Sequence, residues 1–258
     1  MVANVLVCVK RVPDVSGEFA LTEDEQAVDA RHLGWTVSPH EECAVELAAQ
    51  IAGATGGEAT VLSVGSADSA EQLRDAIAVG CTKAVLVEAE PSALGPVDVA
   101  RAIADVVRSH EAGGLTYDVI LLGNDAADTG DFQVPVRLAY ALERPVVTGI
   151  ATCAVEGDRL VARGDGPDGP EVFELPMPAV VAVMEGGVAP RYPSIPGRMK
   201  AKKAAIETIE YAGDALGSGR VRLKLPEAEA STVQILGTGA DAAPAVVDVM
   251  ERLGVLSR

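Results

Sequence analysis

Short apolar runs alternate with longer stretches of helical periodicity over the first 145 residues. Four short, mostly apolar runs predict strands buried on both faces: 5–9, 59–65, 84–87 and 117–123. The stretches between and after them predict helices over 38–51, 66–80, 95–110 and 133–142, the first of them stopping at Gly53. This alternation predicts an α/β fold with a mostly parallel sheet and helices on both faces.

The pattern changes after Pro145, where turn-forming clusters separate four strand-like stretches: 146–155, 159–163, 172–175 and 179–184. These stretches predict an antiparallel extension of the sheet. A break at Gly217-Ser218-Gly219 precedes a possible strand over 233–237 and an amphipathic helix over 241–253. This tail is too short to form its own core and must dock elsewhere. The expected organisation is an α/β nucleotide-binding domain over 1–213 and a C-terminal arm over 214–258.

A long polar stretch over 14–36 predicts a loop that contains a short hairpin, and loops of this length are often functional.

Composition narrows the possible functions. The formal net charge of −17 excludes a basic surface large enough for nucleic acid. Aromatic residues make up only 3%, so the core must consist of Ala, Val, Leu and Ile. The four cysteines are scattered and are expected to be reduced, which indicates a cytoplasmic protein. No apolar run approaches the length of a membrane span.

Candidate chemistry lies where the predicted strands end, because ligands of open α/β sheets bind outside the carboxyl ends of the strands. The loop from Gly123 to Pro135 offers small residues and backbone N–H groups at a helix start, which suits a phosphate or a sugar. An ordinary turn with a helix cap explains the same residues equally well. Val64-Gly65-Ser66 offers backbone donors but fits an ordinary turn better, and Lys10-Arg11 either attracts an anion or is solvated. No acid/base pair, nucleophile set or metal-ligand spacing is present, so no residue is assigned as catalytic or metal-binding.

The segment from Pro190 to Lys203 is stiffened by prolines in its first half and basic in its second half. Ile195 is its apolar tip. The segment is either a docking element for another molecule or a solvated linker, and the pattern alone weighs the two equally.

Three motifs together resemble the β subunit of electron transfer flavoprotein: Val9 to Asp14, Asp128-Thr129-Gly130 and Pro190 to Lys203. The resemblance implies an adenine nucleotide α-hydrolase-like topology and a heterodimer whose α subunit holds most of one FAD. It also implies that the β subunit binds AMP, or a second FAD in some members. Such a protein carries electrons from flavin dehydrogenases, as in fatty acid oxidation, to a quinone oxidoreductase or another acceptor, and is not itself an enzyme.

The resemblance also implies roles for particular residues and segments. The segment 189–203 would include the family's recognition loop, and the arm would dock on the α subunit. The expected nucleotide contacts are Cys8, Val9, Ser38, His40, Ser63, Val64, Gly65, Ser66, Gly123, Asp128, Thr129, Gly130, Gln133 and Val134, and the expected docking residues are Arg191, Tyr192, Ile195 and Pro196.

Two other classes of protein share such a sheet. A nucleotide-binding regulatory module of the stress-protein type would explain the first 145 residues but not the extension, the Pro-rich segment or the tail. An adenylating enzyme of the PP-loop type would need a Ser-Gly-Gly-x-Asp-Ser signature, which this sequence lacks.

Overall fold

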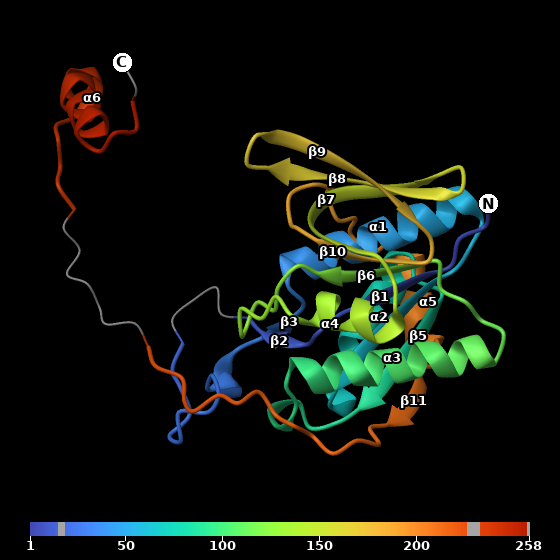
Figure 1. Cartoon of the computed structure of the whole chain (residues 1–258). Coiled ribbons are helices and arrows are strands. Elements are labelled where there is room, and N and C mark those ends of the chain that lie inside the picture. Colours follow the sequence, from blue (N-terminus) through green and yellow to red (C-terminus); the bar gives the residue numbers. More distant parts are fainter. Residues whose placement is uncertain (15–18, 226–232, 257–258) are drawn as a thin grey trace. The chain divides into compact units, whose positions relative to one another are not determined.

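The computed structural model describes residues 1–14, 19–225 and 233–256, and within them a nine-stranded sheet has the order β11-β5-β4-β1-β6-β10-β7-β8-β9 (Figure 1). Neighbouring strands are parallel from β11 to β7, and β7, β8 and β9 are antiparallel to one another. The strands of this sheet are β1 (Val5–Cys8), β4 (Ala59–Gly65), β5 (Lys83–Glu88), β6 (Val119–Gly123), β7 (Val146–Glu156), β8 (Arg159–Gly166), β9 (Gly169–Pro176), β10 (Ala179–Val183) and β11 (Glu207–Glu210).

Helices cover both faces of the parallel part of the sheet. The core on one face is formed with α1 (Pro39–Thr55), α2 (Ala70–Val79) and α5 (Ile195–Lys203). The core on the other face is formed with α3 (Pro96–Ala112) and α4 (Val134–Leu142). Short 3-10 turns lie at η1 (Ala30–His32), η2 (Ala67–Ser69) and η3 (Pro91–Ala93). The predicted α/β class and the core of small aliphatic residues are confirmed; Tyr117, 1% exposed, is the large aromatic exception among the described core residues.

One predicted helix boundary was wrong. Helix α1 continues through Gly53 and ends at Thr55, where Gly56 adopts the left-handed conformation (φ 73°) of a helix C-cap. Gly53 has open space around it, so the helix tolerates it at only a propensity cost. Helix α5 begins at Ile195 because the Ser194 hydroxyl caps it by accepting from the Gly197 N–H.

Three strand predictions also need correction. The stretch 179–184 is not part of the antiparallel extension: β10 is fully buried and lies between β6 and β7, parallel to both. Strand β11 was not predicted, because its mixed polar sequence Glu-Thr-Ile-Glu fits an exposed edge rather than a buried strand. The stretch 233–237 is no strand, and Val233 and Ile235 are 80% and 82% exposed.

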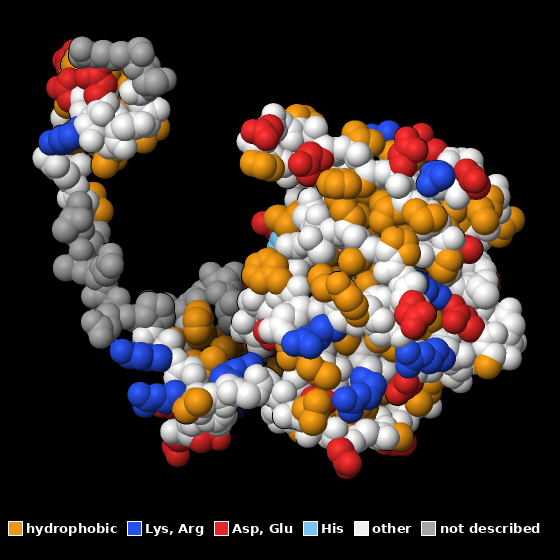
Figure 2. All heavy atoms as spheres, in the orientation of Figure 1, with side chains coloured by type: hydrophobic (Ala, Val, Ile, Leu, Met, Phe, Trp, Pro, Cys, Tyr) orange, Lys and Arg blue, Asp and Glu red, His pale blue; other side chains and the backbone are white. Residues whose placement is uncertain are grey.

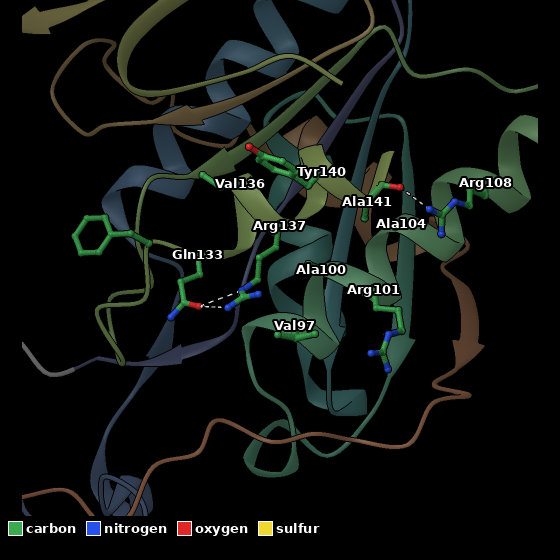
Figure 3. A pocket seen from close by; sticks show the side chains of 11 residues that line it. Val97, Ala100, Arg101, Ala104, Arg108, Gln133, Val136, Arg137, Tyr140 and Ala141 are labelled. Atoms are coloured by element: carbon green, nitrogen blue, oxygen red, sulfur yellow. Dashed lines mark hydrogen bonds between the residues drawn. The ribbon is translucent and has the colours of Figure 1, made fainter. Parts of the chain in front are cut away.

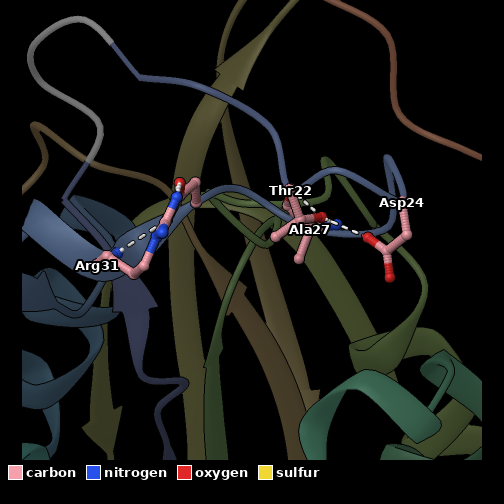
Figure 4. A network of polar contacts seen from close by, with 5 residues as sticks. Thr22, Asp24, Ala27 and Arg31 are labelled. Carbon is pink, nitrogen blue, oxygen red and sulfur yellow. Dashed lines mark hydrogen bonds and ion pairs between the residues drawn. The ribbon is translucent and has the colours of Figure 1, made fainter.

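The long polar loop contains the expected hairpin. Strand β2 (Val12–Pro13) pairs antiparallel with β3 (Trp35–Thr36). Further out, the turn over 21–28 is closed by a β-bridge between Leu21 and Val28 and by the Thr22 hydroxyl, which donates to Asp24 at 2.6 Å (Figure 4). The loop over 14–36 is therefore structured on both sides of residues 15–18.

Backbone contacts divide the chain into two compact units, residues 1–223 and 224–258, and the domain boundary after residue 213 stays a prediction. The last residues of the first unit are held in place: the buried Asp98 accepts from the N–H groups of Leu216 and Gly217, and the Leu223 N–H donates to the Glu25 carbonyl. The second unit contains η4 (Gly239–Ala242) and α6 (Ala243–Arg252), which confirms the predicted C-terminal helix. Docking of this arm on a partner subunit stays a prediction.

No helix of the described part of the chain is long and apolar enough to cross a membrane.

Candidate functional site

The candidate site lies at the carboxyl ends of β1 and β6, the point where the connections of the sheet diverge. From β1 the chain passes through α1 to β4 on one side, whereas from β6 it passes through α4 toward β7 on the other. Such a switch point is where open α/β sheets bind ligands. The loop 124–133, the start of α1 and the residues after β1 meet here.

The start of α1 is fixed to the end of β1 by Glu41. Ser38 caps the helix, its hydroxyl accepting from the Glu41 N–H at 3.2 Å while the Glu41 carboxylate accepts from the Ser38 N–H at 3.0 Å. The other oxygen of Glu41 accepts from the Lys10 N–H at 2.9 Å. Burial raises the pKa of Glu41 to about 8, against the opposing effect of these two donors. Glu41 thus ties two segments of the site together.

Gly123, at the end of β6, lets the first turn of α1 approach closely. A Cβ at this position would lie 2.9 Å from Glu41 Cγ and 3.3 Å from His40 Cβ. Nδ1 of His40 accepts from the Glu185 N–H at 3.0 Å, and its Nε2 lies 2.9 Å from Asp125 Oδ1. With Nδ1 as the acceptor, Nε2 carries the ring proton and faces the carboxylate.

The loop 124–133 folds over the strand ends as a tight turn. The Gly130 N–H donates to the Ala126 carbonyl at 2.7 Å, and Gly130 has a φ of 64°. The Lys10 ammonium forms an ion pair with Asp128 at 2.7 Å, which joins the end of β1 to the loop after β6. The Lys10 ammonium therefore lies at the switch point, where a phosphate would compete with the Asp128 carboxylate for it.

Apart from Asp125 Oδ1, which His40 faces, three buried polar atoms of the described residues around this site have no hydrogen-bond partner: Ser63 Oγ, Thr129 Oγ1 and Arg11 Nε. Buried polar atoms are normally paired, so unpaired ones indicate a site for a polar ligand or water. The guanidinium of Arg11 also lies over the ring of Trp35, with Cζ 3.9 Å from the ring centroid. These hydroxyl and guanidinium groups, with Lys10, fit the hydroxyls and phosphate of a nucleotide.

The structure gathers most of the predicted nucleotide contacts at this switch point. Cys8 ends β1, Val9 follows it, and both are buried. Ser38 and His40 lie at the start of α1. Burial raises the pKa of the Cys8 thiol far above its usual range. The thiol is therefore protonated and behaves as an apolar wall. Val134 opens α4 next to the loop.

The turn after β4 lies beside a different hollow. Val64 is packed against the core, and a Cβ at Gly65 would lie 2.8 Å from Ser69 Oγ, which explains the glycine there. Ser66 lines a hollow of about 480 Å³ together with Asp68, Glu88, Ala89, Glu90 and others. The contacts of a nucleotide with Ser63, Val64, Gly65 and Ser66 stay predictions.

A second hollow, of about 650 Å³, is an open groove between α3 and α4, away from the switch point (Figure 3). Gln133 faces this groove, where its Oε1 accepts from Arg137 at 3.0 and 2.7 Å. Figure 2 shows Lys and Arg side chains among apolar ones on the face that carries α3 and α4.

The predicted docking residues lie on one short segment that ends the connection from β10 and opens α5. Tyr192 is 95% exposed and Ile195 is 78% exposed, and Pro196 is also exposed. Arg191 differs from them because its guanidinium pairs with Glu46 of α1 at 2.6 Å. The segment therefore has an anchored end and an exposed apolar tip.

Sequence reasoning missed Glu41, Asp125 and Trp35 as residues of the site. Glu41 had a readable signal, because Ser38 followed three residues later by a glutamate is the pattern of a capping box. Asp125 and Trp35 had none, since their positions depend on contacts between segments far apart in the chain.

Comparison with known proteins shows which family the chain belongs to. Residues 27–213 match the family model described as "Electron transfer flavoprotein domain". The chain is similar to the electron transfer flavoprotein subunit beta of Syntrophomonas wolfei, with 33% identity over 90% of this chain and 89% of the relative. It is also similar to the proteins of that name from Bacillus subtilis (32% identity; 80% of this chain, 79% of the relative) and Homo sapiens (33% identity; 80% of this chain, 81% of the relative). The chain therefore belongs to the electron transfer flavoprotein β-subunit family.

Proposed function

We propose that this chain pairs with an electron transfer flavoprotein α subunit, helps to hold the FAD of that subunit, and binds AMP in its own switch-point site. The heterodimer would take electrons from flavin dehydrogenases and pass them to a quinone oxidoreductase or another acceptor. Family membership supports the electron-transfer role and, with it, a flavin cofactor.

The unpaired hydroxyls of Ser63 and Thr129 are the observation that carries the AMP proposal. Both atoms are buried near the carboxyl ends of β4 and β6, where a ribose or a phosphate would satisfy them. In this proposal Lys10 exchanges its partner Asp128 for the phosphate, and the N–H groups at the start of α1 and α4 face the anion. A second FAD, which also contains an AMP moiety, is the alternative ligand for the same groups.

The chain itself would not perform bond chemistry. When bound, a flavin accepts and releases one or two electrons, and the described residues of this chain would orient it and exclude water around it. The capping box of Ser38 and Glu41 fixes the start of α1, and His40 is held between Glu185 and Asp125. These contacts would give the ligands a rigid wall, and the exposed tip at Ile195 would contact the electron donor.

Nucleotide content of the purified heterodimer tests the proposal. After coexpression with the α subunit, acid extraction followed by chromatography should release AMP and FAD in about equal amounts. Thr129→Val should lower the AMP content and leave the FAD content unchanged, because it removes the buried unpaired hydroxyl. The matched control is Thr208→Val on the exposed edge strand β11, which should change neither.

Two results would contradict the AMP site. One is a heterodimer without any adenine nucleotide beyond the FAD of the α subunit. The other is full AMP occupancy in Thr129→Val. Two FAD molecules per heterodimer, with no AMP, would instead favour the alternative of a second FAD.

A further inference from the structure

The segment that carries the exposed docking tip is attached to α1 through Glu46. This carboxylate lies on the buried side of α1 and is 4% exposed. Its Oε2 accepts from Arg191 Nε at 2.7 Å and from the Arg191 backbone N–H at 3.2 Å. Its Oε1 accepts from Arg191 Nη2 at 2.6 Å and from Gln50 Nε2 at 2.7 Å. One buried carboxylate therefore fixes both the side chain and the backbone of Arg191.

This arrangement is a bidentate, charge-assisted pair, which restricts orientation more than a single hydrogen bond does. The hydrogen bonds from Arg191 lower the pKa of Glu46 below its usual value, so the carboxylate stays ionised at neutral pH. A buried carboxylate that lost this partner would be left without compensation for its charge. The pair is therefore suited to hold the chain in place.

Backbone contacts fix the segment on both sides of Arg191. Before it, the Cys43 thiol of α1 donates to the Val188 carbonyl at 3.4 Å. After it, Gly197 of α5 packs so closely on the carbonyl of Ala78 in α2 that a Cβ would clash. The residues between these points are thus held at three places along the chain.

The exposed residues follow directly from these anchors. Tyr192 comes immediately after Arg191 and is 95% exposed, and Ile195 is 78% exposed at the first turn of α5. Neither side chain is packed on the chain itself. Their outward direction is set by the neighbouring anchors, because the prolines between them stiffen the segment. Fixing a docking segment before binding lowers the ordering cost of association.

We infer that Glu46 is a positioning residue for the docking segment, and that Arg191 acts through Glu46 as an anchor instead of contacting the electron donor. This inference rests on the proposed docking role of the segment. It assigns the contact with the partner to Tyr192 and Ile195 alone. It also predicts that Glu46 and Arg191 act as one unit.

The test uses the heterodimer purified with its α subunit. Hydrogen exchange of the 188–196 backbone amides is measured without any dehydrogenase present, in Glu46→Gln and in Arg191→Lys. Both should exchange about tenfold faster than the wild type, because each breaks the bidentate pair. Glu42→Gln is the matched control: it makes the same substitution one turn earlier on α1, at an exposed position, and should leave exchange unchanged.

A second measurement separates anchoring from direct contact. With a flavin dehydrogenase from the same cells as the electron donor, both variants should raise KM for the heterodimer about equally and leave kcat unchanged. The double variant should raise it no further, since the two residues act as one unit. Ile195→Ala is the reference for the loss of a direct contact. This variant should raise KM and leave the hydrogen exchange of residues 188–196 unchanged.

Unchanged exchange in Glu46→Gln and Arg191→Lys would overturn the inference. Additive effects of the two substitutions on KM would also overturn it. The same holds if Arg191→Lys raises KM and Glu46→Gln does not, because that result is expected of an arginine that touches the donor. If Ile195→Ala leaves KM unchanged, the proposed docking role fails, whereas the exchange measurement still decides whether Glu46 anchors the segment.

Discussion

Ile195→Ala perturbs the proposed contact with the electron donor most selectively. The residue is 78% exposed, so nearly four-fifths of its surface is free to become buried against a partner. Full burial of an isoleucine side chain is worth about 1.5–3 kcal/mol. Truncation to alanine keeps the first carbon, so the expected loss in docking free energy is about 1–2 kcal/mol, or roughly 5- to 30-fold in affinity.

The stability of the protein should not change, because Ile195 occupies the first helical position of α5, where alanine is favourable and no packing is lost. The assay is steady-state reduction of the heterodimer by a flavin dehydrogenase at limiting heterodimer concentration. KM should rise by that factor while FAD content and melting temperature match the wild type. Val172→Ala is the matched control: Val172 is 61% exposed on β9, far along the chain from the docking segment. Turnover equal to the wild type at limiting concentration, or an equal loss in the control, would refute the reasoning.

Three further predictions concern the scaffold of the site. The folded-state pKa of Glu41, about 8, exceeds the ordinary value of 4.5, so its stabilisation is fully present below pH 4.5 and is lost as pH rises through 8. Glu41→Gln should therefore flatten the decline of unfolding free energy between pH 5 and 8 in urea titrations, by up to about 3.5 kcal/mol, and parallel curves would contradict the assignment. Gly123→Ala should lower the free energy of unfolding by about 1–3 kcal/mol, because the added methyl group overpacks against α1. Gly53 lies within α1 and has open space around it, so Gly53→Ala should raise the free energy of unfolding by about 0.5–1 kcal/mol. Melting temperatures equal to that of the wild type would contradict both. Asp98→Asn should speed hydrogen exchange of the Leu216 and Gly217 amides, because the carboxylate accepts from both, and unchanged exchange would show that other contacts hold this segment.

The parallel core could be predicted from the sequence because its strands carry a strong local signal. A run such as Val5 to Val9 has no polar residue and fits only a strand buried on both faces. Strand β10 has the same signal, but its predicted place in the antiparallel extension was wrong. Its pairing with β6 and β7 depends on the topology of the sheet and not on the composition of the strand. Strand β11 was missed because an edge strand with glutamates at both ends has no such signal.

The site shows the same division. The loop after β6 was identified from its position between a strand and a helix, and the structure places it at the switch point. The ion pair of Lys10 with Asp128 and the anchor of Arg191 on Glu46 were not foreseen, because each joins residues far apart in the sequence. Long-range pairs of this kind are a property of the fold, and one sequence without its structure does not reveal them.

Coexpression with the α subunit tests the central claim most directly. The account predicts a yellow heterodimer that contains about one flavin per α subunit and is reduced by a flavin dehydrogenase, with AMP released on acid extraction. A colourless protein that purifies without the α subunit, forms its own oligomer and hydrolyses ATP would contradict it.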